Sequence, residues 1–99
     1  MNHVSKPPVV KTASALLHTG PCIFNGFLVG TDGVNDPEIT IYNNTAATGE
    51  KVIPTNTYDA ALLGINGVTG ISQYCDKGLY LSIALGAGAV EVVAQFTAL

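Results

Sequence analysis

The stretch Glu38-Ile39-Thr40-Ile41-Tyr42-Asn43 decides the fold class, because polar and apolar side chains alternate along it with a period of two. An extended chain with this period places Ile39 and Ile41 on one face and Glu38, Thr40 and Tyr42 on the other. The sequence therefore predicts a β-strand with one buried face.

The residues after this strand predict a hairpin. Residues 44–49 are small and polar, as in a loop. Extended structure resumes over residues 50–54 and is expected to end at Pro54, because a central strand does not tolerate proline. We expect the two strands to pair through the loop between them.

The C-terminal part of the chain repeats the alternation in two segments, residues 79–85 and 89–96, on either side of the turn formers Gly86-Ala87-Gly88. So short a turn favours a second hairpin made of these two strands. The apolar faces comprise Leu79, Leu81, Ile83 and Leu85 in the first strand and Val90, Val92, Ala94 and Phe96 in the second.

The remaining segments also favour strands and turns. Residues 14–18 are typical of a strand, and residues 22–29 form a β-rich run in which Gly26 indicates a bulge or a bend. Residues 30–37 are dense in turn formers. The glycines at positions 64, 67 and 70 would each weaken a helix by about 1 kcal/mol, so strands and turns are expected there.

Together these segments predict an all-β fold, a small antiparallel β-sandwich or flattened barrel of about seven to eight strands. Residues 1–12 contain Pro7-Pro8, which disfavours a helix, so we expect an extended N-terminal arm that reaches onto neighbouring molecules. Residues 13–99 are expected to form a single β-sandwich domain.

Charge and hydropathy restrict the partners of the protein. Four Lys, no Arg and seven acidic residues give a net charge of -3, which argues against nucleic acid and against an anionic membrane. No apolar run approaches the roughly 20 residues of a membrane span, and no signal peptide is expected. Only 11% of the residues are charged and 47% are hydrophobic, so some apolar surface should contact another protein.

The two cysteines, Cys22 and Cys75, belong to no CxxC motif and to no Cys/His cluster, so zinc is not expected. We expect two free thiols in the core, the alternative being a disulfide if their strands are neighbours. His18 follows an apolar pair and is expected to be an exposed or hydrogen-bonded strand residue.

Motifs for catalysis and for cofactor binding are lacking in the sequence. No serine stands in a GxSxG motif, and residues 64–70 match neither GxGxxG nor a phosphate-binding loop. A glycosidase pair of Asp59 and Asp76, and a calcium ion held by Asp32, Asn35 and Asp36, are both less favoured than turn-forming roles for these residues. We therefore expect a protein that is not an enzyme and that has no cofactor or metal.

Four segments share their strand spacing and turn chemistry with a known type of protein: Phe27-Leu28-Val29, residues 39–49 from Ile39-Thr40-Ile41-Tyr42-Asn43 into the Thr/Ala/Gly loop, Gly78-Leu79-Tyr80-Leu81, and Val90-Glu91-Val92-Val93. In this pattern, which covers residues 26–96, the chain resembles small β-sandwich structural proteins of tailed bacteriophages. The resemblance implies a virion component that is assembled in the host cytoplasm and that has no catalytic residues.

Among virion components, the size of the chain favours a capsid decoration or cement protein. Such a protein would bind the major capsid protein or other virion proteins and would form a homo-oligomer, with a trimer among the candidates. Two alternatives stay open. One is a component of the neck, tail or baseplate, and the other is a receptor- or carbohydrate-binding module, which would need aligned exposed aromatic side chains.

Partner contacts are expected from the arm, from the polar loop over residues 43–49 and from two tyrosines whose hydroxyl groups suit the rim of an interface. The candidate partner-binding residues are His3, Val4, Lys6, Pro7, Pro8, Val9, Val10, Tyr42, Asn43, Asn44, Thr45, Thr48 and Tyr80.

Overall fold

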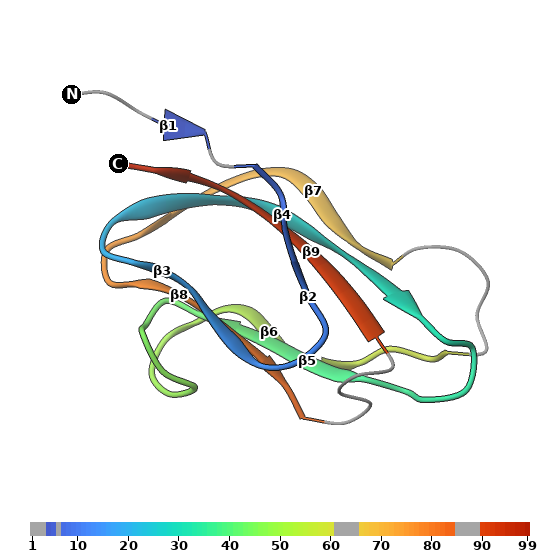
Figure 1. The fold of residues 1–99 in the computed structure, drawn as a ribbon. Helices are drawn as coiled ribbons and strands as arrows, with labels where there is room; N and C mark the ends of the chain where they lie inside the picture. The colour runs from blue at the N-terminus through green and yellow to red at the C-terminus, as the bar shows by residue number, and fades with distance from the viewer. Residues whose placement is uncertain (1–3, 6, 61–65, 85–89) are drawn as a thin grey trace.

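Two antiparallel β-sheets lie face to face in the protein (Figure 1). The computed structural model describes residues 4–5, 7–60, 66–84 and 90–99, and these ranges contain nine β-strands and no helix. In chain order the strands are β1 (Val4–Ser5), β2 (Val9–Lys11), β3 (Ala15–Thr19), β4 (Cys22–Thr31), β5 (Glu38–Tyr42), β6 (Lys51–Thr57), β7 (Asn66–Cys75), β8 (Gly78–Ile83) and β9 (Val90–Ala98).

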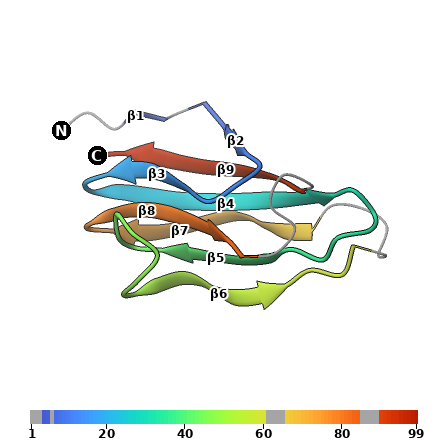
Figure 2. The same cartoon turned by 60° about the horizontal axis from the view of Figure 1, so that its bottom comes forward.

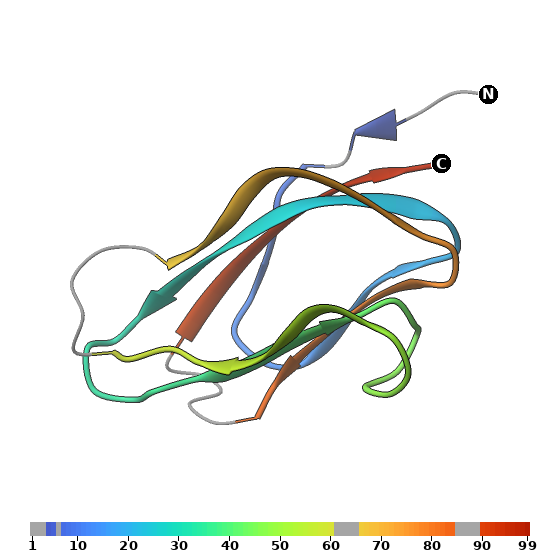
Figure 3. The same cartoon turned by 180° about the vertical axis from the view of Figure 1, so that it is seen from behind.

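The strands are divided between a β9 sheet and a β8 sheet. In the β9 sheet, β9 lies between β4 and an edge made of β1 and β2, and β7 forms the other edge. In the β8 sheet the order is β3, β8, β5, β6. Figure 1 shows the two layers, in Figure 2 the strands of the β8 sheet come in front of those of the β9 sheet, and Figure 3 shows β7 and β6 as the edges on one side of the molecule. The predicted all-β sandwich is therefore confirmed.

The core lies between the sheets and contains the apolar residues that the alternation predicts. Leu79, Leu81 and Ile83 of β8 are at most 4% exposed, and so are the four apolar residues predicted for β9. Ile39 and Ile41 of β5 are fully buried. Full burial of a side chain of this size stabilises the fold by roughly 1.5–3 kcal/mol, so these strands supply much of the stability.

The bulge predicted at Gly26 is confirmed, and it changes which residues of β4 face the core. The register of β4 against both of its neighbours shifts between Phe24 and Gly26. Phe24 is buried before the shift, whereas Phe27 and Val29 are buried after it. Strict alternation would turn Phe27 outward, so the extra residue places both phenylalanine rings in one core, with centroids 6.4 Å apart.

The hairpin predicted for the last two strands is wrong. β8 pairs with β3 and β5, whereas β9 pairs with β1, β2 and β4, so the two strands belong to different sheets. The period of two identifies the buried face of each strand but does not identify its partner. Leu85 and the turn formers Gly86-Ala87-Gly88 lie outside the described residues.

The hairpin of β5 and β6 is confirmed, but β6 does not end at Pro54. The strand continues to Thr57 because β6 is the edge of its sheet, where one side of the backbone needs no hydrogen-bond partner. The strand and turn structure expected around Gly67 and Gly70 is present as β7, and residues 61–65 lie outside the described part of the chain.

The described residues of the N-terminal segment are extended along one edge of the β9 sheet. Val4 lies opposite Ala98 and Val9 lies opposite Ala94, so β1 and β2 pair with successive parts of β9. The first of these pairs brings the two ends of the described chain side by side (Figure 1). The chain then crosses to the β8 sheet, where the Ser14 hydroxyl accepts a hydrogen bond of 2.8 Å from the Ile83 N–H.

Candidate protein-contact surfaces

The candidate partner-binding residues do not gather in one place in the structure. Tyr42 and Tyr80 lie on the outer face of the β8 sheet, whereas Val9 and Val10 belong to the edge of the β9 sheet. The 43–49 loop follows β5 at one end of the sandwich. Pro7 and Pro8 are exposed between β1 and β2. His3 and Lys6 lie outside the described residues, and for Val4 only the backbone is described.

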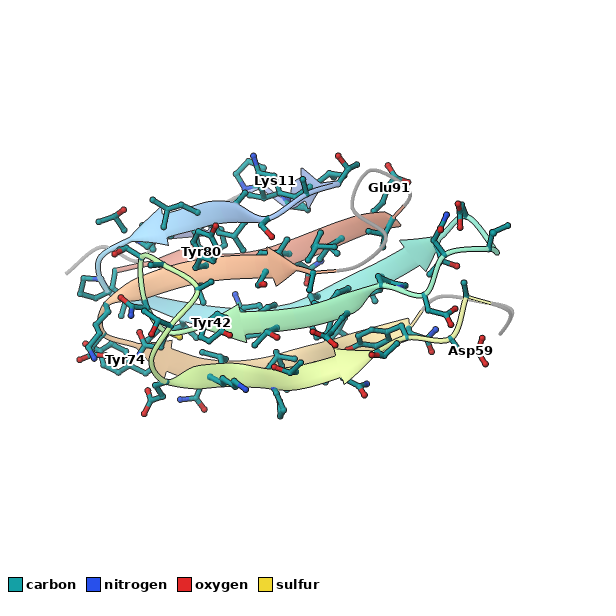
Figure 4. All side chains as sticks on the ribbon, turned by 90° about the horizontal axis from the view of Figure 1, so that it is seen from below. Lys11, Tyr42, Asp59, Tyr74, Tyr80 and Glu91 are labelled. Carbon is teal, nitrogen blue, oxygen red and sulfur yellow. The ribbon has the colours of Figure 1, made fainter. Side chains whose placement is uncertain are left out.

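Tyr42 and Tyr80 are directly paired across β5 and β8, and Tyr80 is in turn paired with Leu16 of β3. Directly opposed residues of antiparallel strands point to the same face, so these three side chains form a row across the sheet, which we call the tyrosine row. Both tyrosines are partly exposed, and Leu16 is 46% exposed. Figure 4 shows the two tyrosines on neighbouring strands. The tyrosine row is thus an apolar and aromatic strip on an outer face.

A second row crosses the outer face of the β9 sheet. Val10 of β2 is paired with Val93 of β9, which is paired with Leu28 of β4. We call these three residues the valine row. Val10 is 53% exposed, and the other two are partly exposed. On the same face Ile23 is paired with Tyr74, which is 56% exposed. Both outer faces of the sandwich therefore carry apolar side chains that a partner could cover.

Asn43 does not belong to either surface, because its side chain is buried and fully used within the chain. Its amide nitrogen donates hydrogen bonds to Glu50 Oε1 at 3.0 Å and to Asp76 Oδ1 at 2.7 Å. Its amide oxygen accepts a hydrogen bond of 3.0 Å from the Lys77 N–H. At 4% exposure, Asn43 joins the β5–β6 loop to the β7–β8 turn and offers no surface to a partner in this conformation.

The rest of the 43–49 loop is held by bonds within the loop. The Asn44 side chain donates to the Thr48 carbonyl at 2.8 Å and accepts from the Thr45 N–H at 2.8 Å. The Thr48 N–H donates to the Ala46 carbonyl at 2.8 Å. Thr45 and Thr48 are exposed, so the loop presents two hydroxyl-bearing side chains on a braced backbone.

Two exposed aspartates have pKa values that hydrogen bonds lower. The amide of Asn43 holds the pKa of Asp76 below its usual range. The backbone N–H groups of Asn35 and Val34, with the Asn35 side chain, do the same for Asp32. In both cases the donor groups favour the charged carboxylate.

The positions of the carboxylates argue against a calcium site in the 32–36 loop and against a glycosidase pair of Asp59 and Asp76. Asp32 accepts hydrogen bonds from its own loop, and Asp36 Oδ1 accepts one of 2.8 Å from the Ala60 N–H, so both act as turn formers. Asp59 lies at the opposite end of the sandwich from Tyr74, which is two residues from Asp76 (Figure 4). Asp59 and Asp76 therefore do not meet. Within the described ranges, no three His, Cys, Asp or Glu side chains are grouped as metal ligands.

His18 differs from its expected setting. Its ring packs at an angle against the ring of Phe96 in the other sheet, with centroids 5.3 Å apart. A register shift between Leu16 and His18 produces this contact, because it changes the face to which His18 points. His18 is therefore a packing residue at the end of the core.

Comparison of the chain with protein-family models, with curated proteins and with solved structures gives no match. In the described strands and loops, no helix is long and apolar enough to cross a membrane.

The sequence singled out the tyrosines and Val10 as candidates, but it did not single out Leu16, Leu28 and Val93, which the structure places in the same two rows. The alternation in residues 89–96 did place Val93 on the outer face of its strand. The alternation could not predict that β9 pairs with β2 and β4, because this pairing joins residues that are distant in sequence.

Proposed function

We propose that the protein is a non-enzymatic structural component of a virion, a capsid decoration or cement protein that binds other protein subunits through its sheet faces. The observation that carries the proposal is the tyrosine row. Three apolar or aromatic side chains stand side by side on an outer face, and Leu16 remains 46% exposed in the single chain.

The properties of this row suit a permanent contact between proteins. Tyrosine supplies a large apolar ring with a hydroxyl group that can remain at the wet rim of an interface. Lys51 is the residue paired with Tyr42 at the end of the row, so a charge lies at its border rather than in its middle. With only 11% charged residues, the chain as a whole requires little desolvation of charge on assembly.

The assignment to a virion is supported by the resemblance of residues 26–96 to structural proteins of tailed phages. In a shell, many copies would each make a modest contact, and the repeated contacts would add up through multivalency. The partners would be the major capsid protein or other virion proteins, together with further copies of this chain. A site in the neck, tail or baseplate would use the same surfaces.

The test begins with the mass of the purified chain by light scattering, alone and mixed with shell particles from the same source. A double variant, Leu16→Ser with Tyr80→Ser, should weaken oligomer formation or shell binding at least tenfold. The matched control is Val34→Ser, since Val34 is 80% exposed but lies in the 32–36 turn, outside both rows. A chain that stays monomeric and ignores the shell, or a double variant that binds like the control, would contradict the proposal.

The contribution of the N-terminal segment to shell binding is tested by a point variant rather than by a deletion. Removal of residues 1–12 would also remove β2, which pairs with β9 and whose Val9 packs against the core. Val10→Ser leaves that packing in place, because Val10 points outward from the same strand. Weaker shell binding by Val10→Ser, at unchanged stability, would assign a contact to the valine row.

A carbohydrate-binding module is the second candidate, favoured by the direct pairing of Tyr42 with Tyr80. Two neighbouring rings on one face could stack against a sugar. A glycan screen separates the two functions: saturable glycan binding that Tyr42→Ser abolishes, without any binding to a shell, would replace the structural role.

A further inference from the structure

The two cysteines of the chain lie directly opposite one another in neighbouring strands. Cys22 is the first residue of β4 and Cys75 is the last residue of β7, and the two are register partners in this antiparallel pair. Both side chains are fully buried on the inner face of the β9 sheet, and both thiols are free. The proposed contact surfaces make no use of either thiol.

Register fixes the geometry that a disulfide needs. The Cα atoms of directly opposed residues in an antiparallel pair are about 4.5 to 5.5 Å apart. A disulfide spans Cα separations of about 4.4 to 6.8 Å, with both Cβ atoms on one face of the sheet. Cys22 and Cys75 meet both conditions through backbone pairing, so closing the bond requires only a small approach of the two Cβ atoms and no change of register.

The two thiols are close enough for each to change the pKa of the other. The hydrogen bond with Cys75, together with burial and the charge of a Cys75 thiolate, raises the pKa of the Cys22 thiol. The same hydrogen bond lowers the pKa of Cys75, against the opposing effects of burial and of the Glu50 and Asp76 carboxylates. The Cys75 thiol also donates a hydrogen bond of 3.6 Å to the Gln73 carbonyl. Cys75 lies at the end of an edge strand beside the exposed Asp76 and Lys77, so opening of that strand end would expose its sulfur before that of Cys22.

We propose that Cys22 and Cys75 form an oxidisable pair, which closes into a cross-strand disulfide in oxidising surroundings and fixes the edge strand β7 to β4. The oxidant is a small-molecule disulfide. The Cys75 thiolate attacks one of its sulfur atoms, forming a mixed disulfide and releasing the first small thiolate. Cys22 then loses its proton and attacks the Cys75 sulfur, releasing the second. Two electrons pass from the protein thiols to the oxidant, and the two protons end on the two released thiols.

The bond would act at the β7 edge of the sheet, where few side chains are buried. Apart from Cys75, no residue of β7 is buried, although Ile71 packs against the core from a partly buried position. Among the described strands β7 has a neighbour on one side alone, so its end can open without disturbing the rest of the sheet. That opening admits the oxidant to the buried thiols. Once formed, the disulfide prevents the strand end from opening again. The inference stands apart from the proposed function, since it rests on the register of β4 and β7.

The experiment measures the disulfide equilibrium of the full chain in a glutathione buffer of fixed composition, once in native conditions and once in urea. Each equilibrium is approached from the reduced and from the oxidised protein, with samples refolded in the buffer so that burial does not block the reaction. After acid quenching and alkylation of free thiols, intact mass gives the oxidised fraction and peptide mapping identifies the linked cysteines. Cys22→Ala and Cys75→Ala serve as controls that retain one thiol each.

We expect the ratio of intramolecular disulfide to dithiol to be at least tenfold higher in the native chain than in urea, with Cys22 linked to Cys75. The oxidised protein should unfold several degrees above the reduced protein, and reduction should reverse the shift. Each single-cysteine control should give a mixed disulfide alone. A native ratio equal to or below the ratio in urea, or an oxidised form with a lower unfolding midpoint, would overturn the proposal.

Discussion

Gly26 of β4 and Gly67 of β7 each approach the backbone of the other's strand so closely that neither position has room for a side chain. A Cβ atom at Gly67 would stand 2.2 Å from the Phe27 carbonyl oxygen, and one at Gly26 would stand 2.4 Å from the Val68 carbonyl oxygen. Both glycines also have positive φ angles, 140° and 133°, that other residues rarely adopt. These two close approaches allow the bulged part of β4 to pack against β7.

Gly67→Ala should therefore destabilise the protein by about 1–3 kcal/mol, because the backbone would have to leave its conformation and move away from β4. Urea unfolding followed by circular dichroism measures the loss. Gly30→Ala is the matched control, since Gly30 lies in β4 with no atom within 4 Å of the added Cβ and no positive φ. Equal stabilities of the two variants would show that the close approach is not required.

Asn43→Ala should cost about 2–3 kcal/mol, because the substitution removes three hydrogen bonds of a buried amide and leaves the Lys77 N–H without its acceptor. Thermal or urea unfolding measures the change. Thr12→Ala is the control, as Thr12 is exposed between β2 and β3 and its replacement should change the free energy of unfolding by less than about 0.5 kcal/mol. A loss no larger than that of the control would contradict the bracing role given to Asn43.

At acid pH, the free energy of unfolding should depend on the protonation of Asp76 and Asp32. Their folded-state pKa values are lowered, so their contribution to stability is present above the unfolded value, near about pH 4, and is lost as the pH falls through the folded values. Carboxyl chemical shifts followed by NMR give each pKa directly. In Asn43→Ala the pKa of Asp76 should rise toward the unfolded value while that of Asp32 stays unchanged. A rise at both positions would contradict the assignment of the Asp76 shift to Asn43.

Two neighbouring residues of β4 should respond very differently to truncation. Phe27 is 2% exposed and its ring packs edge-on against Tyr58, so Phe27→Ala should cost about 3–5 kcal/mol through the lost burial and the cavity. Leu28 points to the outer face, so Leu28→Ala should cost less than about 1 kcal/mol. Calorimetry of both variants checks which side chains of β4 face the core after the bulge. A larger loss of stability in Leu28→Ala than in Phe27→Ala would place Phe27 outside the core.

The alternation of side chains was enough to predict the class of fold and most of its core. In β5, β8 and β9 every described apolar residue assigned to the inner face is buried, because half-buried strands require a period of two. The same alternation could not show that β8 and β9 belong to different sheets. A short turn between two strands is compatible both with a hairpin and with a crossing from one sheet to the other. Strand partners are set by contacts distant in sequence, which no local pattern contains.

The candidate surfaces were predictable only in part for the same reason. Tyr42 and Tyr80 stood out as tyrosines on outer faces, but their direct pairing and the neighbouring Leu16 depend on the order of strands in the sheet. Asn43 was expected at a surface because it follows a strand and precedes a polar loop. Its burial depends on Asp76 and Lys77, which come from a turn more than thirty residues away.

The pairing of β1 with the end of β9 has a consequence for how the chain could be rearranged. The described ends emerge from the same pole of the sandwich, while the exposed turn around Val34 occupies the other pole (Figure 1). A short linker between the ends would join them without crossing the core, and new ends could be opened in that turn. The architecture is thus suited to circular permutation, in which the order of synthesis of the strands changes while the order of their packing stays the same.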